Sequence, residues 1–151
     1  MCKTIIGIYV FLFLCFVNVS AQPLLIGRVS VNQTHIAFTY AGKIWLVERA
    51  GGAARKLNDA GAENNPVFSP DGKQMAFARW NGGDFDIYVS AAIGGEAKRL
   101  TFQGEDDLPV AWTPDGQAVV FESTRDEEGV TLSSPHLLPH SDGEFFSVLQ
   151  L

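Results

Sequence analysis

The side chains best suited to chemistry gather near the C-terminal end of the chain. They are of the types found in nucleophilic triads: Ser133, Ser134, His136, His140 and Asp142. A triad needs a fold that brings three side chains together and holds the serine on a constrained turn. This segment is interrupted by prolines and has no G-x-S-x-G sequence. We therefore expect no catalytic residue in it.

An acidic run, Glu105-Asp106-Asp107, is the second candidate. Carboxylate oxygens suit hard cations, but the D-x-D-x-D spacing with a loop glycine and a later glutamate is missing. We expect a solvated loop there, and we predict no metal ion or other cofactor for the chain. A weaker hypothesis is that Asp106 and Asp107 meet the positively charged ends of peptides.

Other polar candidates have simpler structural interpretations. The segment 81–86 (NGGDFD) is predicted to be a hairpin loop in which Asp86 accepts backbone hydrogen bonds. His35 is expected in a surface turn. Asn32-Gln33-Thr34 fits an N-glycosylation acceptor, which matters only in a eukaryotic secretory pathway.

A repeat of about 40 residues dominates the chain and must position any site. The segment 66–77 (PVFSPDGKQMAF) returns as 109–121 (PVAWTPDGQAVVF), so that Asp71 and Asp115 are 44 residues apart. A degenerate copy lies at 29–38, where Asn32-Gln33 stands in for Asp-Gly. Short strands repeated at this period are typical of β-propeller blades.

Each repeat contains four short strands and characteristic turns. Asp71-Gly72 and Asp115-Gly116 predict two-residue type I′ hairpins, because both positions of such a turn need positive φ. Gly-Gly turns at 51–52 and 94–95 lead into outer strands, whose basic residues are expected to face water: Arg55, Lys56, Lys98 and Arg99.

The same pattern assigns the tryptophans. Trp45 and Trp112 lie in apolar strands and are expected in the core, whereas Trp80, beside the loop at 81–86, is the one to test for exposure.

The predicted fold is therefore all-β, a partial β-propeller of two to three four-stranded blades within residues 22–125. The blades are expected at about 24–61, 62–104 and 105–125 onward. Closed propellers need roughly four to eight blades. We expect either an N-terminal fragment of a longer chain or a ring closed by self-association.

Residues 1–21 have the features of a cleaved signal peptide. Lys3 precedes an apolar run from Ile5 to Val17, and small residues precede a predicted cleavage before Gln22. A membrane anchor is the alternative, but the run is shorter than the roughly 20 residues of a comfortable span. A lipid anchor on Cys15 is disfavoured by bulky Leu14. The predicted location is periplasmic or secreted.

Composition narrows the partners. Both cysteines, Cys2 and Cys15, lie in the leader, so the mature chain can form no disulfide. Without Lys3 it has 10 basic and 17 acidic residues, a net charge of −7. This charge disfavours nucleic acid and anionic membranes. The expected partners are a protein or peptide ligand, and missing blades or a second copy.

Residues 24–123 resemble the WD40-like propeller repeats of TolB and of tricorn-type proteases. Two segments are similar to the first propeller of secreted tricorn-like serine peptidases: the opening unit at 36–47 and the passage from 98 to 116. The resemblance implies a non-catalytic segment that serves substrate access or protein interaction. The alternatives are a TolB-like periplasmic protein-binding module and the propeller of a prolyl-oligopeptidase-type enzyme.

The family pattern weakens after residue 124. Residues 126–151 are predicted to be a diverged or truncated third blade, with a disordered segment as the alternative. The last residues, from Phe145 to Leu151, could form a strand, but out of register with the repeat.

Overall fold

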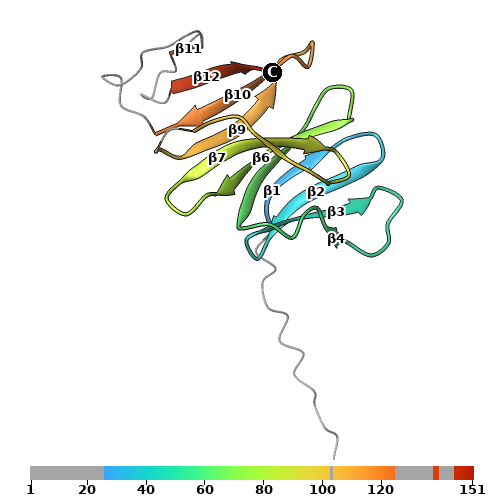
Figure 1. The fold of residues 1–151 in the computed structure, drawn as a ribbon. Coiled ribbons are helices and arrows are strands. Elements are labelled where there is room, and N and C mark those ends of the chain that lie inside the picture. Colours follow the sequence, from blue (N-terminus) through green and yellow to red (C-terminus); the bar gives the residue numbers. More distant parts are fainter. Residues whose placement is uncertain (1–25, 103, 125–137, 140–144) are drawn as a thin grey trace, which may run out of the picture.

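The computed structural model describes residues 26–102, 104–124, 138–139 and 145–151. These residues form three four-stranded antiparallel sheets that follow one another along the chain (Figure 1). Among them no helix is long and apolar enough to cross a membrane. The prediction of an all-β partial propeller is confirmed.

The first two sheets have the same simple order. The first contains β1 (Ile26–Val31), β2 (His35–Tyr40), β3 (Lys43–Glu48) and β4 (Arg55–Lys56). The second contains β5 (Glu63–Phe68), β6 (Gln74–Trp80), β7 (Phe85–Ala91) and β8 (Lys98–Arg99). In both, each strand pairs with the next one along the chain, as a propeller blade requires.

The third sheet departs from this order. It contains β9 (Asp107–Trp112), β10 (Ala118–Ser123), β11 (Leu138–Pro139) and β12 (Phe145–Gln150). β12 pairs directly with β10, and β11 lies at the outer edge although it comes earlier in the chain. The final strand departs from the sequence spacing of the repeat, as predicted, yet it takes the place of the third strand of a blade. Ala118 pairs with Gln150 as Gln74 pairs with Ala91, both at the equivalent place of the repeat.

Apolar side chains between neighbouring sheets form two layers of core. The layer between the first and second sheets contains Ala37, Ile44, Leu46, Leu57, Phe68, Met75, Phe77 and Ala92. The layer between the second and third contains Ala76, Ile87, Val89, Trp112, Val119 and Phe121. Full burial of one large apolar side chain stabilises a fold by about 1.5–3 kcal/mol, so these layers hold the sheets together.

The first strands of the three sheets lie next to one another, and hydrogen bonds join them. The Phe68 N–H donates to Ser30 Oγ at 3.1 Å, and Trp112 Nε1–H donates to the Val67 carbonyl at 3.0 Å. The two bonds join equivalent positions of the repeat. The first has a backbone donor and a side-chain acceptor, and the second has a side-chain donor and a backbone acceptor. Trp112, which is 8% exposed, therefore lies in the core as predicted.

The hairpin turns differ from the predicted type I′ turns. Only Gly72 and Gly116 have positive φ, 70° in each, and Asp71 and Asp115 do not. Gly72 N–H donates to the Ser69 carbonyl at 2.8 Å, which closes a four-residue turn that ends in the positive-φ glycine. Type I′ geometry occurs instead between β2 and β3, where Ala41 and Gly42 have φ values of 50° and 69°.

A buried ion pair ties β7 to β8. The Asp86 side chain is fully buried, and its Oδ2 lies 2.6 Å from Arg99 Nη2. Its Oδ1 accepts a hydrogen bond from Thr101 Oγ1 at 3.3 Å, and Asn81 Nδ2 also donates to the carboxylate. The Asp86 carboxylate thus binds side-chain donors and not the backbone donors that were predicted. Arg99 is only partly exposed, so the prediction that it faces water is wrong.

Replacing Asp86 by alanine is expected to lower the free energy of unfolding by about 3 kcal/mol, because it leaves the Arg99 charge without its buried partner. Urea denaturation at fixed protein concentration measures this loss. Asp59→Ala is the control, since Asp59 lies 3.7 Å from Lys56 with its side chain 94% exposed. That change is expected to cost less than about 1 kcal/mol. Equal losses in the two variants would contradict a structural role for the buried pair.

Candidate binding site

The axial hollow is a cavity of about 150 Å³ where the first strands of the three sheets meet. It is lined by Arg28, Val29, Ser30, Asn65, Pro66, Val67, Pro109 and Val110. The strand pair Ile26↔Tyr40 of the first sheet is equivalent to the pair Glu63↔Arg79 of the second. Arg28 and Asn65, each two residues further along its strand, therefore hold the same position of the repeat. Pro109, 44 residues after Asn65, holds that place in the third sheet.

One position of the repeat therefore brings a guanidinium, a carboxamide and a proline to the same hollow. The strands fix the backbone at this position, and the side chain is free to differ between sheets. Variation of this kind on a fixed scaffold is where binding specificity is usually found.

Asn65 is the most unusual residue of the axial hollow. Its φ is +49°, and the pairing of β5 with β6 shifts between Asn64 and Val67. Asn65 is 4% exposed, and its Nδ2 has no hydrogen-bond partner among the described residues. A buried donor without a partner costs about 1–3 kcal/mol, and such features cluster where a ligand is bound.

Asn65 is the neutral amide donor among the side chains that line the hollow, and Arg28 is the charged donor. Pro66 and Pro109 have no backbone N–H, so they provide only rigid apolar walls and carbonyl acceptors. Arg28 is exposed and adds a positive charge at the first strand. The arrangement is suited to binding a carbonyl or carboxylate oxygen and has no nucleophile positioned beside a base.

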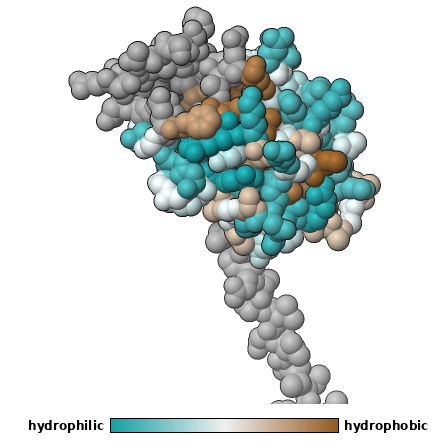
Figure 2. Space-filling model, viewed as in Figure 1, coloured by the Kyte–Doolittle hydropathy of each residue, from teal (hydrophilic) through white to brown (hydrophobic). Residues whose placement is uncertain are grey.

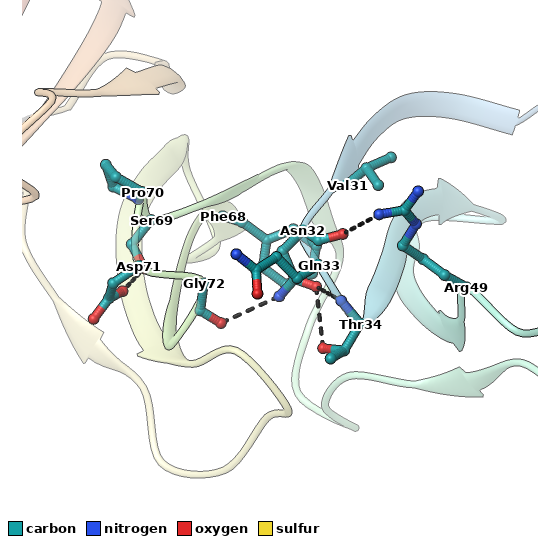
Figure 3. A pocket seen from close by; sticks show the side chains of 10 residues that line it. All are labelled: Val31, Asn32, Gln33, Thr34, Arg49, Phe68, Ser69, Pro70, Asp71 and Gly72. Atoms are coloured by element: carbon teal, nitrogen blue, oxygen red, sulfur yellow. Dashed lines mark hydrogen bonds between the residues drawn. The ribbon is translucent and has the colours of Figure 1, made fainter.

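The hairpin hollow is a larger cavity of about 530 Å³ between the β1–β2 and β5–β6 turns (Figure 3). Asn32 crosses it: its Nδ2 donates to the Gly72 carbonyl at 3.1 Å, and its Oδ1 accepts from the N–H groups of Thr34 and His35. Arg49 Nη1 donates to the Asn32 carbonyl at 3.4 Å. The Asn32 side chain therefore orders the first turn and ties it to the second sheet, and glycosylation of Asn32 would break these bonds.

Asn32 also has a different place in the repeat from the one predicted. Its N–H donates to the His35 carbonyl at 3.0 Å, as the Ser69 N–H does to the Gln74 carbonyl. Asn32 thus corresponds to Ser69 and not to Asp71, and the turn of the first sheet is shorter. His35 begins β2, half-buried, with Nδ1 2.8 Å from Thr34 Oγ1.

The turn carboxylates beside the hairpins are held in their charged form. Asp71 accepts from the Lys73 N–H at 3.0 Å and from Ser69 Oγ at 2.7 Å. These bonds, the backbone one first, lower the pKa of Asp71. The Thr113 hydroxyl and then the Gln117 N–H lower the pKa of Asp115 in the same way.

The structure does not assemble the candidate catalytic side chains of the C-terminal segment. Ser133, Ser134, His136, His140 and Asp142 all lie outside the described residues.

The acidic run is not the solvated loop that was expected. Glu105 is exposed, but Asp106 is half-buried and its Oδ1 accepts the Phe85 N–H at 2.9 Å. Asp107 is fully buried at the start of β9, at the place that Glu63 holds in β5. Within the described ranges no three His, Cys, Asp or Glu side chains are placed to share a metal ion.

Of the two remaining tryptophans, Trp80 is exposed as expected, whereas Trp45 is not the core residue that was predicted. Trp80 is 42% exposed and packs edge-on against Phe85, with ring centroids 5.3 Å apart. Trp45 is only half-buried, because it lies on the face of the first sheet that no described sheet covers, and its Nε1–H donates to the Tyr40 carbonyl at 3.1 Å. The expectation that Trp45 is a core residue is therefore wrong.

Comparison with known proteins identifies relatives of this architecture. A family model described as the tricorn protease N-terminal beta propeller domain matches residues 23–145. The chain is 34% identical over 110 residues to tricorn protease homolog 1 of Streptomyces coelicolor, which covers 72% of this chain and 10% of that protein. It is 32% identical over 100 residues to the uncharacterized peptidase YuxL of Bacillus subtilis, with 62% and 14% covered. The chain thus spans a small part of these curated relatives.

Solved structures share the fold. TolB from Acinetobacter baumannii superposes with a TM-score of 0.59 at 25% identity, over 85% of this chain and 32% of that one. The tricorn protease gives 0.57 at 24% identity, over 67% and 11%. The acylaminoacyl peptidase of Pyrococcus horikoshii gives 0.56 at 18% identity, over 83% and 23%, which shows the fold alone.

The pKa values of Asp71 and Asp115 give a prediction about pH. An aspartate whose folded-state pKa lies below its unfolded value of about 3.9 stabilises the fold above that value, and the contribution is lost as pH falls through the folded pKa. We expect carboxyl NMR titrations to place both pKa values below about 3.9. Between pH 5 and pH 2.5, the wild-type chain should lose more stability than the Asp71→Asn/Asp115→Asn variant, as followed by urea denaturation. The same loss in both proteins would show that these turn bonds do not stabilise the charged form.

Proposed function

The chain belongs to the family of tricorn protease N-terminal β-propeller domains, and from this premise we propose that it is a non-catalytic propeller segment that binds protein or peptide outside the cytoplasm. The observation that carries the proposal is the axial hollow, where Asn65 brings a buried amide donor to the meeting point of three sheets. A passing peptide chain offers a carbonyl at every residue, and each is an acceptor for such a donor.

The geometry favours recognition of main chain over side chain. The walls formed by Pro66, Val67 and Pro109 are apolar and rigid, and they offer no pocket of opposite charge for a particular residue type. Asn65 can bind any peptide carbonyl, and Arg28 adds attraction for a carboxylate. A hollow of this kind suits many sequences, which is the property needed for substrate access or for contact with unfolded segments.

The proposed location depends on the leader. Residues 1–21 lie outside the described residues, and the proposal of a periplasmic or secreted protein relies on their signal-peptide pattern.

Two other functions have specific support. The likeness to TolB at 25% identity favours a periplasmic protein-binding module. The likeness to the uncharacterized peptidase YuxL at 32% identity favours the propeller of a peptidase, such as one of the prolyl-oligopeptidase type. A G-x-S-x-G motif in coding sequence after Leu151 would favour the enzyme, a PDZ-like segment with distant serine-peptidase motifs would favour the tricorn type, and neither would favour TolB.

Asn65→Gly tests peptide binding at the axial hollow. Glycine adopts φ of +49° without strain, so the variant should be as stable as the wild type or slightly more stable. Its affinity for labelled unstructured peptides, measured by fluorescence anisotropy, should fall about tenfold, because one hydrogen bond worth about 1 kcal/mol or more is lost.

Gln33→Ala is the matched control, because Gln33 lines the hairpin hollow and not the axial one. It should bind as the wild type does. Loss of binding in Gln33→Ala with full binding in Asn65→Gly would move the site to the hairpin hollow, and a wild-type chain that binds no peptide would overturn the proposed ligand class.

The proposed export has its own test. Expressed in a bacterial host, the chain should appear outside the cytoplasm with Gln22 as its first residue by intact mass and N-terminal sequencing. Leu12→Arg places a charge in the apolar run and should keep the full-length chain inside the cell. Retention of residues 1–21 on an exported, membrane-bound product would favour the anchor instead.

A further inference from the structure

The outward face of the first sheet is an apolar surface that no described sheet covers. We call it the open face; it consists of Val29, Val31, Ile36, Phe38, Trp45 and Val47. Cross-strand pairing places these side chains together, because Val31 pairs with Ile36 and Phe38 pairs with Trp45. Val29 is 55% exposed and Val31 54%, values unusual for neighbouring valines in a sheet.

The equivalent face of the second sheet shows how such a face is buried. Phe68 and Met75 are a strand pair equivalent to Val31 and Ile36, and Phe77 and Tyr88 are equivalent to Phe38 and Trp45. Phe68, Met75 and Phe77 are 8%, 0% and 0% exposed. Their cover is the opposite face of the first sheet, which presents Ala37, Ile44, Leu46 and Leu57.

The third sheet repeats the arrangement. Trp112, Val119 and Phe121 are buried under Ala76, Ile87 and Val89 of the second sheet. We call the covering side of a sheet its forward face; it carries Ala37 in the first sheet and Ala76 in the second. Among the described residues, each covered face is thus covered by the forward face of the preceding sheet. The open face lacks such a cover among the described residues.

The third sheet has a forward face of its own. Val120 holds the place of Ala76 in the repeat and pairs with Ala111 as Ala76 pairs with Val67. Val120 and Ala111 are only half-buried, whereas Ala76 is fully buried. The chain therefore carries one face that receives a sheet and one face that can cover a sheet, at opposite ends of the same stack (Figure 1).

Charge is complementary between these two faces. Glu122 on the third sheet holds the place of Thr39, whose hydroxyl donates to Asn64 Oδ1 of the next sheet at 3.3 Å. The place of Asn64 in the first sheet is Gly27, directly beside exposed Arg28. A third sheet docked on an open face would bring an acidic residue close to a basic one.

We propose that the open face receives the third sheet of a second copy of this chain, and that the reverse contact forms at the same time. Two stacks of three sheets would then close into a ring of six, within the four to eight blades of closed propellers. The assembly has two-fold symmetry: the contact between the third sheet of one copy and the open face of the other occurs twice, and the ring closes because each copy contributes both faces. The inference does not require the proposed peptide site, although Arg28 and Val29 also line the axial hollow.

The test is the mass of the chain in solution by size-exclusion chromatography with light scattering. The wild type should have twice the 16.4 kDa mass of the full chain, or twice the mass of the processed chain if the leader is removed. Val31→Glu and Val120→Glu should each be monomeric, because each places a charge at both contacts of the ring. Circular dichroism should show unchanged β-structure, since both positions are already part-exposed in the single chain.

An equimolar mixture of Val31→Glu and Val120→Glu should recover a dimer. The first variant keeps an intact third sheet and the second an intact open face, so one contact of the mixed pair is unaltered. The double variant Val31→Glu/Val120→Glu should stay monomeric. Ile93→Glu is the control, because Ile93 is 59% exposed in the β7–β8 turn and lies on neither face.

Several results would overturn the proposal. A monomeric wild type would mean that another occupant covers the open face, such as a later sheet of a longer polypeptide. A dimer that survives Val31→Glu would place the interface elsewhere. Assembly that grows with concentration beyond two copies would show contacts that do not close, and a mixture without recovery would exclude the head-to-tail pairing.

Discussion

The whole structure depends on the stacking of one sheet on the next. Each sheet is apolar on both faces, so it cannot be stable in water until both faces are covered. Ala37 and Leu46 point to one side of the first sheet, and Phe38 and Trp45 point to the other. The aliphatic residues of one face pack against the larger, partly aromatic residues of the next sheet, which gives the stack a direction. That direction decides which side chains are buried and which remain half-exposed. In Figure 2, hydrophobic residues are visible on the surface of the molecule among the hydrophilic ones.

Stacking also determines where polar chemistry can be placed. Charged groups within a layer must be paired, and the second sheet contains two such ion pairs. Glu63, whose side chain is fully buried, accepts hydrogen bonds from Arg79 at 2.8 and 3.1 Å, and the Arg79 guanidinium lies 4.6 Å from the centre of the Tyr88 ring. Asp86 and Arg99 form the other pair. Both pairs lie in the layers and join strands, so they fix the alignment of a sheet and are not available to a ligand.

The sequence was sufficient to predict the fold because the repeat is carried by residues with one strong physical requirement each. Glycines at 72 and 116 need positive φ, and the apolar runs after them can only be buried strands. Turn type and side-chain exposure were predicted wrongly where one sequence is compatible with two local structures. Asp-Gly fits a type I′ turn and also a longer turn that ends in a positive-φ glycine, and only the latter occurs. Likewise, Lys-Arg at 98–99 reads as a solvated outer strand, but Arg99 reaches back to a carboxylate 13 residues earlier.

The axial hollow could not be predicted for a related reason. Asn65 lies between Asn64 and Pro66 in a strand, and nothing in that sequence specifies a bulge with φ of +49°. The conformation arises because β5 must pair with β6 on one side and pack between β1 and β9 on the others. The hollow therefore exists only as a product of stacking, since each of its walls belongs to a different sheet. A partner that covers the open face would contact Val29. Val29 also lines the axial hollow. The proposed assembly and the proposed peptide site therefore share Val29, and a substitution there is expected to alter both.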